Sequence, residues 1–479
     1  MMRSIFLLTC ALGTVALVAQ VSPDKQAAID LLESRRAEFA DLALQIWDYA
    51  ELGYMEEKST AALQERLRTE GFSIESGVAG LPTGFVASYG EGKPVLGLIS
   101  EFDALPGVSQ AAVPYREERP GNNNGHACGH HLFGTGSAAA AIAVKDWLQR
   151  TGNPGTIRVY GTPAEEGGAG KVYMVREGLF DDVDAVLSWH AGDRNNVTAR
   201  SCLAIVSVKF RFYGESAHAA GFPERGRSAL DGVEAMNHMV NMMREHVSDK
   251  SRIHYVITHG GLAPNVVPAF AEVYYFVRHP DMREVAAIFD RMVAAAEGAA
   301  LGTQTRMDYE ITGGSYNVLP NETLAHVYYD NLVKVGGVQY DSVELAFAKA
   351  IMQTYPTGEL VPEDAAKVLP LEISDQAGNY STDAGDVSWV APYISLRGAT
   401  WTPGTASHSW QAVATGGTSI GIKGVMVAAK TIAMSAIDLF NNPALIQEAQ
   451  DELQRRRGKD FRYEALLGDR EPALDYMKK

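Results

Sequence analysis

Three histidines and one cysteine fall within six consecutive positions of the stretch GNNNGHACGHH, residues 121–131. A thiolate and an imidazole two positions apart, Cys128 and His130, can bind one metal ion from a single loop. Gly125 and Gly129 flank this pair and allow the loop to turn tightly. A redox-active thiol or a crowded turn has the same composition, so this stretch by itself leaves the three alternatives open.

Further donor side chains lie elsewhere in the chain. They are Glu165 and Glu166 in PAEE and His190 in SWH, which follow predicted strands, and His408 far downstream in SHSW. Thiolate, imidazole and carboxylate ligands together suit zinc, manganese or cobalt. Neighbouring glutamates repel each other unless a cation or a proton neutralises one of them, so one can bind metal while the other transfers protons. Each residue alone has an ordinary structural explanation, and their joint occurrence favours a metal site.

Strand-like and helix-like segments alternate through residues 22–205. The strand-like segments are GFVASYG, PVLGLISEFDALP, GTIRVYGTPAEEGG and DAVLSWHAGD, and a helical pattern runs through TGSAAAAIAVKDWLQR. This alternation predicts an α/β domain with a mostly parallel sheet. Ligands of such sheets bind at the carboxyl ends of the strands, which is where EFD, PAEE and SWH fall.

A different pattern occupies residues 206–316. Its segments follow the order β-α-β-β-α-β, which predicts an inserted ferredoxin-like α+β domain. The α/β pattern resumes over residues 317–445, which therefore form the second part of the first domain. Residues 446–479 are a charged C-terminal tail, most simply a solvated helix.

Composition and charge disfavour two classes of partner. The 479 residues are 46% hydrophobic and 21% charged, as in soluble globular proteins. With 42 basic and 58 acidic residues the net charge is −16, which disfavours binding to nucleic acid or to an anionic membrane surface.

The first 21 residues differ from the rest of the chain. Arg3 precedes a short apolar run that ends in small residues near Ala19, a pattern typical of a secretory signal peptide. A buried N-terminal helix is the alternative. We expect an exported protein, periplasmic or secreted, with no membrane span in its mature chain. Removal of Cys10 would leave Cys128 and Cys202, which excludes a disulfide framework but permits one bridge.

Eight motifs occur in an order that resembles a known family. They are ELGYMEE, EFDALPG, NGHACGHH, TPAEEGG, SWH, ESAHAA, APNVVP and SHSW. This order resembles the M20 metallopeptidases, in their aminoacylase and amidohydrolase branch (subfamily D). EFDALPG and STDAGDVSW bring the chain nearest to the B-type chains of aminobenzoyl-glutamate hydrolase. The resemblance covers residues 25–445.

The resemblance implies a two-metal site and a dimer. The implied ligands of two divalent ions (zinc or manganese, with cobalt as a third candidate) are Cys128, His130, Glu166, His190 and His408. Glu165 would be the general base, and Asp103 would fix an imidazole ligand. The inserted domain would form a homodimer, so that His218 enters the partner subunit's site and stabilises the oxyanion. Asn265 and Arg278 would hold the tetrahedral intermediate and the substrate carboxylate. A second, different subunit is an alternative partner.

One motif departs from other branches of the family. Those branches carry His-x-Asp where this chain has Glu101-Phe102-Asp103, so we expect Cys128 and His130 to replace the missing imidazole ligand. His126 and His131 are expected to be structural.

These expectations lead to one functional hypothesis and two alternatives. The chain would be a dinuclear metal-dependent amidohydrolase that cleaves N-acyl or N-aroyl amino acids, or short peptides, with a free carboxylate. A non-catalytic metal- or peptide-binding relative is one alternative. A thiol amidase with Cys128 as nucleophile is the other. Export disfavours p-aminobenzoyl-glutamate as substrate, because that folate catabolite is intracellular.

Overall fold

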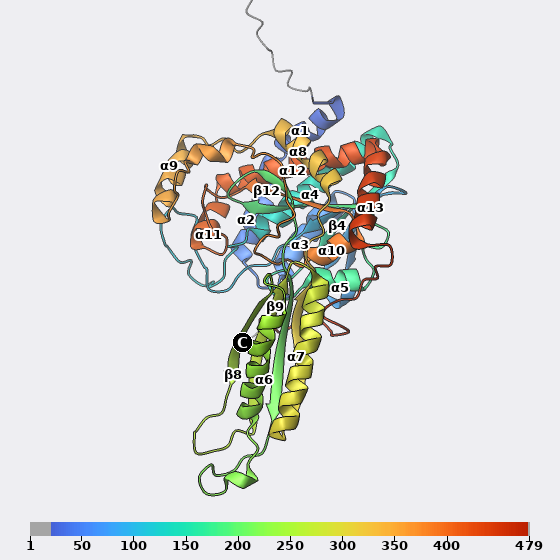
Figure 1. Cartoon of the computed structure of the whole chain (residues 1–479). Helices are drawn as coiled ribbons and strands as arrows, with labels where there is room; N and C mark the ends of the chain where they lie inside the picture. Colours follow the sequence, from blue (N-terminus) through green and yellow to red (C-terminus); the bar gives the residue numbers. More distant parts are fainter. Residues whose placement is uncertain (1–20, 478–479) are drawn as a thin grey trace, which may run out of the picture.

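The structure, a computed structural model, describes residues 21–477. A large α/β domain carries an elongated arm of strands and two long helices that projects from one side (Figure 1). The predicted signal peptide, residues 1–21, lies almost wholly outside the described residues. The described chain begins with helix α1, Pro23–Ser34, whose first turn is capped by the Ser22 side chain.

The large domain is built on one eight-stranded sheet, in the order β1-β2-β4-β3-β5-β12-β6-β11. Its strands are β1 (Ser73–Ser76), β2 (Phe85–Glu91), β3 (Val95–Ser100), β4 (Gly155–Gly161), β5 (Ala185–Gly192), β6 (Asn196–Ala199), β11 (Glu372–Ile373) and β12 (Tyr393–Ala399). The central strands β4, β3, β5 and β12 are mutually parallel, whereas β2 and β6 run antiparallel to their inner neighbours. The predicted mostly parallel α/β domain is confirmed.

Helices cover this sheet and bury its apolar strands. They are α2 (Arg36–Tyr49), α3 (Glu57–Thr69), α4 (His130–Thr151), α5 (Gly170–Arg176), α8 (Glu322–Val335), α9 (Ser342–Ile351), α10 (Ala384–Val390), α11 (Trp410–Gly416), α12 (Ser419–Asn441) and α13 (Pro443–Arg457). Among the described helices, α12 is long and apolar enough to cross a membrane, but it is largely buried. It packs against α1, α4 and α8 and is a core helix of this domain.

The projecting arm, which we call the lid, has its own sheet and its own core. Its elements are β7 (Ala204–Tyr213), α6 (Ala229–Met243), β8 (Arg252–His259), β9 (Phe270–His279), α7 (Met282–Thr303) and β10 (Arg306–Ser315). The antiparallel sheet has the order β10-β7-β9-β8, and α6 and α7 pack against it (Figure 1). Phe210, Phe212, Met236 and Met292 are buried between them. The predicted ferredoxin-like arrangement is confirmed.

From its charge we expected the C-terminal segment to be a solvated tail. This expectation is wrong, because part of the segment is buried. Ile446, Ala449 and Leu453 give α13 a buried face. The Glu452 carboxylate accepts hydrogen bonds from the N–H groups that begin α8. Beyond Gly458 the chain continues along both domains, where Arg470 donates to the lid carbonyl of Ile311 at 2.6 Å. The sequence does contain a signal for this burial, since apolar residues recur at helical spacing in the segment. The many charged residues around them hid it.

Candidate active site

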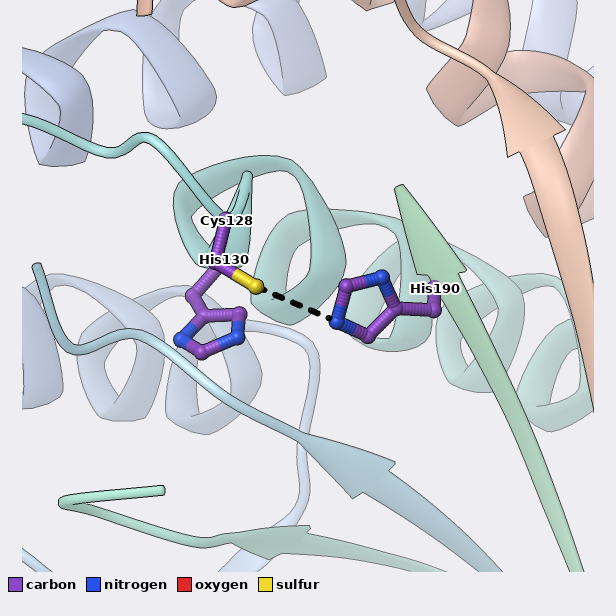
Figure 2. Close-up of side chains that lie close together, drawn as sticks. All are labelled: Cys128, His130 and His190. Carbon is purple, nitrogen blue, oxygen red and sulfur yellow. Dashed lines mark hydrogen bonds between the residues drawn. The ribbon is translucent and has the colours of Figure 1, made fainter. Parts of the chain in front are cut away.

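Neighbouring strand ends bring the predicted donor groups together. Asp103, Glu165 and His190 follow or end β3, β4 and β5, which lie side by side in the sheet. Cys128, in the loop before α4, and His130, the first residue of α4, lie at the same edge (Figure 2). This is the carboxyl edge of the parallel strands, where ligands of such sheets bind.

Gly129 allows Cys128 and His130 to face the same site. It has a φ of 79°, and a Cβ atom there would lie 2.4 Å from the Cβ of Ala191. Any other residue would therefore carry both backbone strain and a steric clash. The glycine lets the loop turn into α4, whose first residue is His130.

Cys128 and His190 direct their donor atoms at each other. The Cys128 Sγ lies 3.5 Å from the His190 Nε2, and Figure 2 shows the thiol close to both imidazole rings. The His190 Nδ1 lies 2.7 Å from the carbonyl of Ala191 and donates to it, which leaves the Nε2 lone pair free for the site. Burial, followed by the positive charges of Arg397 and His130, lowers the pKa of His190 to about 3. The ring is thus neutral and able to bind a metal.

His130 lies between two carboxylates. Its Nδ1 donates to the Asp103 Oδ1 at 2.7 Å, so in the neutral ring the lone pair is on Nε2. That Nε2 faces the Glu101 Oε2 at 3.0 Å, and neither atom has a hydrogen-bond donor among the described residues. Burial lowers the pKa of His130, but Cys128, Asp103 and Glu101 raise it by more, to well above its usual value. In the metal-free chain this shift favours a proton on the Nε2, facing Glu101, and a bound divalent cation would replace that proton.

Glu166 and His408 form the other side of the cluster. The Glu166 Oε1 is buried without a hydrogen-bond donor and lies 3.2 Å from the His408 Nε2. His408 has a left-handed backbone, and its N–H donates to the Ala127 carbonyl at 2.9 Å. This bond fastens the His408 loop to the cysteine loop, although 280 positions separate His408 from Cys128.

The donor atoms form two groups that share one thiol. Cys128, His130 and His190 make one group, and Cys128, Glu166 and His408 make the other. Within each group the donor atoms lie within 4.8 Å of one another. Thiolate, imidazole and carboxylate donors fit borderline-soft divalent ions, and the shared Cys128 fits a bridging ligand. A third group joins Glu101, His130 and Glu165.

Glu165 lies on a constrained loop beside the cluster. The preceding residue, Ala164, has a φ of 57°, and its N–H donates to the buried Glu56 Oε1 at 2.8 Å. Burial, followed by the charges of Glu101 and Glu166, raises the pKa of Glu165 well above its usual value. A half-buried carboxylate with this shift is suited to accepting a proton from a reacting group.

The structure adds two charged residues that the sequence did not reveal, Lys171 and Asp383. Lys171 is fully buried, and its Nζ lies 2.8 Å from the Glu101 Oε1 and 2.7 Å from the Asp383 Oδ1. Glu101 is therefore held between Lys171, which neutralises its charge, and His130. From sequence, a lysine at the start of a helix is expected to be exposed to solvent. Only the tertiary fold brings these three charges together.

The remaining histidines of the GNNNGHACGHH stretch contact backbone atoms. The Nε2 atoms of His126 and His131 lie 3.1 and 3.2 Å from the carbonyls of Ile46 and Gly416. Both rings thus brace the loop against neighbouring helices. Cys128 and Cys202 are free thiols, so the Cys128–Cys202 bridge that the sequence permits is not formed.

The predicted lid residues fall in two places. Arg278 lies near the end of β9 and lines a cavity of about 430 Å³ that also contains Cys128, Glu165 and His408. His218 and Asn265 lie in the two loops at the far end of the lid, where the Ala219 N–H donates to the Asn265 carbonyl. Within one chain, these two residues do not reach the cavity.

Comparison with known proteins gives the family. A model of Peptidase family M20/M25/M40 matches residues 97–461. The chain is 42% identical to the B-type chain of p-aminobenzoyl-glutamate hydrolase from Escherichia coli K12, over 89% of this chain and 94% of that protein. It is 28% identical to the human Xaa-Arg dipeptidase, over 89% and 93% of the two chains.

A solved structure agrees with this assignment in its fold. The Bacillus subtilis protein described as a dinuclear metal binding peptidase of the M20 family superposes with a TM-score of 0.57. The two chains are 17% identical, and the match covers 85% of this chain and 99% of the other. The family match and the 42% identical relative, both spanning most of the chain, show that this protein belongs to peptidase family M20/M25/M40 and is a hydrolase.

Proposed function

We propose that this protein is a dinuclear metal-dependent amidohydrolase that cleaves N-acyl or N-aroyl amino acids, or short peptides, with a free carboxylate. One observation carries this proposal. The donor atoms of Cys128, His130 and His190, and those of Cys128, Glu166 and His408, form two groups within 4.8 Å that share the Cys128 thiol. Two such groups fit two neighbouring divalent ions. The two-metal description of the Bacillus subtilis relative supports the same stoichiometry.

Five side chains would hold the ions, namely Cys128, His130, Glu166, His190 and His408. Two divalent ions, zinc or manganese with cobalt as a third candidate, would polarise the amide carbonyl and activate the attacking water. Glu165 would take a proton from this water and return it to the leaving amine. Glu165 and Glu166 line the same cavity. Glu165 would therefore transfer protons directly beside the metal ligand Glu166.

The thiol-amidase alternative requires Cys128 to be a thiolate nucleophile. Burial raises the pKa of the Cys128 thiol, and although His130 lowers it, burial together with Glu166 and Glu165 outweighs that effect. A nucleophilic cysteine needs the opposite environment, whereas metal binding itself removes the thiol proton. A non-catalytic relative would not need Glu165, whose carboxylate is present beside the cluster.

We further propose a homodimer formed through the lid. His218 is exposed at the far end of the lid, and the Nδ1 of its ring accepts from the N–H of Gly221 at 3.1 Å. This leaves the Nε2 available to a neighbouring subunit, where it would stabilise the oxyanion. The edge strand β8 presents Tyr255, Val256 and Ile257, an apolar surface suited to association. A second, different subunit is an alternative partner, since p-aminobenzoyl-glutamate hydrolase, which includes the 42% identical relative, has two kinds of subunit.

Export remains a proposal that rests on Arg3 and the apolar run after it. Amino-terminal sequencing of the protein recovered from a fractionated native host would show a start near residue 20 if the run is removed. An unprocessed Met1 in the cytoplasmic fraction would contradict export.

A hydrolysis screen tests the proposed activity. N-acyl amino acids and dipeptides are incubated with the protein and Mn²⁺, Zn²⁺ or Co²⁺, and release of the free amine is measured. We expect EDTA to abolish hydrolysis and iodoacetamide to have little effect on the metal-loaded enzyme. Loss of hydrolysis with iodoacetamide alone would favour the thiol amidase, and no hydrolysis with any metal would favour a binding protein.

A further inference from the structure

Two tyrosines from opposite ends of the chain pack against the loop that carries Glu165 and Glu166. Tyr54 lies just before α3, and Tyr476 lies near the end of the described chain. Their rings meet edge to face, with centroids 5.7 Å apart. Tyr54 is buried, and its hydroxyl donates to the Gly168 carbonyl at 2.6 Å. The pair of rings thus lies against the backbone that follows the proposed general base.

Two glycines leave the space that the Tyr476 ring occupies. A Cβ atom at Gly53 would overlap the Tyr476 Oη and would lie 2.9 Å from the Cβ of Ala164. A Cβ atom at Gly167 would lie 3.4 Å from the Tyr476 Cε2. The ring is therefore enclosed between the turn before α3 and the backbone of the Glu165 loop, and a side chain at Gly53 would displace it.

The Tyr476 hydroxyl makes no polar contact that could explain this position. It is buried and has no hydrogen-bond partner among the described residues. Burial, followed by the charge of Asp103, raises the pKa of this hydroxyl, and the Glu166 and Glu165 carboxylates add to the shift. The hydroxyl is therefore neutral. Tyr476 acts on the loop through the packing of its ring.

Contacts with both domains fix the segment that ends in Tyr476. This segment lies beyond residue 461, where the family match ends. Arg176, the last residue of α5, donates to the carbonyl of Arg470 at 2.7 Å. Arg470 in turn donates to the lid carbonyl of Ile311. Leu474 and Tyr476 pack against the core of the large domain. The position of the Tyr476 ring is thus set by the assembled fold.

We propose that Tyr476 is a positioning residue for Glu165, whose ring, together with that of Tyr54, holds the loop so that the base lines the cavity. This inference rests on the proposed function, in which Glu165 is the base. Glu166 has a tie of its own, because its N–H donates to the Asp103 Oδ2 at 2.9 Å. Loss of the Tyr476 ring should therefore impair proton transfer more than metal binding.

The kinetic test removes the ring and then restores it, with the best substrate of the hydrolysis screen. Tyr476→Ala should reduce kcat about ten- to a hundred-fold, as a displacement of about 1 Å can do, with KM and bound metal per chain unchanged. Tyr476→Leu should lie between Tyr476→Ala and the wild type. Tyr476→Phe should have the wild-type kcat, because it fills the same space and the lost hydroxyl has no partner in the described chain.

Tyr89→Ala is the matched control. Tyr89 is also half-buried against the core of the large domain, but it pairs with Ile157 near the start of β4, whereas Glu165 follows the end of that strand. Its kcat should equal that of the wild type. Urea unfolding of Tyr89→Ala and Tyr476→Ala shows whether a loss of stability alone accompanies a loss of turnover.

Hydrogen exchange tests the same packing without turnover. The N–H groups of Gly168 and Ala169 both donate to the Ala164 carbonyl at 2.9 Å, so their exchange reports opening of the loop. In the Mn²⁺-loaded protein, a peptide containing residues 164–169 should exchange faster in Tyr476→Ala than in the wild type, Tyr476→Phe or Tyr89→Ala.

Three results would overturn the positioning role. They are an unchanged kcat in Tyr476→Ala, a fall in kcat matched by an equal loss of metal, and an unchanged exchange of the loop peptide. Failure of the wild type to hydrolyse any amide would instead overturn the proposed function. The exchange of the loop peptide would then still decide whether Tyr476 holds the loop.

Discussion

Asp103 connects His130 to Glu166 through a single carboxylate. Its Oδ1 accepts from the His130 Nδ1 at 2.7 Å, and its Oδ2 accepts from the Glu166 N–H at 2.9 Å. One buried group therefore sets the orientation of an imidazole and the position of a carboxylate-bearing loop. Both belong to the proposed set of metal ligands.

Replacement of Asp103 should weaken metal binding. In Asp103→Ala the His130 ring loses its partner, and we expect the affinity for Mn²⁺ or Zn²⁺ to fall about 10–100-fold. Metal titration of the apo-protein followed by calorimetry measures this. Asp375→Asn, at an exposed position, is the control. An unchanged affinity of the Asp103 variant would show that the carboxylate does not orient the ligands.

Glu165→Gln should separate metal binding from turnover. The amide retains the shape of the side chain but cannot accept the proton, so kcat should fall about 10²–10⁴-fold. Elemental analysis should find the metal content of the wild type, because Glu165 is not among the proposed ligands. Glu166→Gln, one position along, should lose metal as well as turnover. Turnover at the wild-type level in Glu165→Gln would refute the assignment of the base.

Mixed dimers test whether His218 acts on the neighbouring subunit. Each of the variants His218→Ala and Glu165→Gln should be inactive alone. After mixing and subunit exchange, half of the dimers should be mixed, each with one intact site, which restores about a quarter of the wild-type sites. Activity in the mixture is measured against each variant alone. A mixture as inactive as its components would place His218 in the site of its own chain.

Asp386 should give the folded state a dependence on pH. Burial raises its pKa from 3.8 to about 7, so the folded state keeps a proton that the unfolded chain releases. Between these pH values stability falls as pH rises, by up to about 1.4 kcal/mol per pH unit. Urea unfolding of the wild type and of Asp386→Asn, at pH values of about 5.5 and 7.5, isolates this contribution.

The free energy of unfolding of the wild type, relative to that of Asp386→Asn, should fall by about 2 kcal/mol between the two pH values. Asp386 accepts hydrogen bonds from the Tyr316 N–H and the Tyr463 hydroxyl. Their loss in Asp386→Asn changes the free energy of unfolding equally at both pH values, so it does not produce the predicted difference between them. A difference independent of pH would show that Asp386 is ionised in the folded state.

Local patterns carried enough information to predict the order of strands and helices. The continuous apolar run in PVLGLIS predicts a buried parallel strand, and β3 is one. The alternation in LAIVSVKFRFYG predicts a half-buried antiparallel strand, and β7 is one. Strand ends also predicted which donors meet, because parallel strands end at one edge of a sheet.

Contacts between distant segments carried no such local signal. Lys171 becomes a buried partner of Glu101 and Asp383 only when α5 packs against α10. The burial of the C-terminal segment against Ile311 likewise depends on the assembled lid. His408 could be proposed from its motif, but its 2.9 Å bond to the Ala127 carbonyl follows from the tertiary fold.

The most direct test of metal-dependent amide hydrolysis is the rate measured against bound metal per chain. Metal is removed stepwise with a chelator from the wild type and from Cys128→Ala, and both are then reloaded. We predict that wild-type hydrolysis falls with the loss of two ions per chain and returns on reloading. Cys128→Ala should bind less metal at every step, whereas Cys202→Ala should match the wild type. Hydrolysis that persists in the metal-free wild type, or full metal binding by Cys128→Ala, would contradict the proposed site.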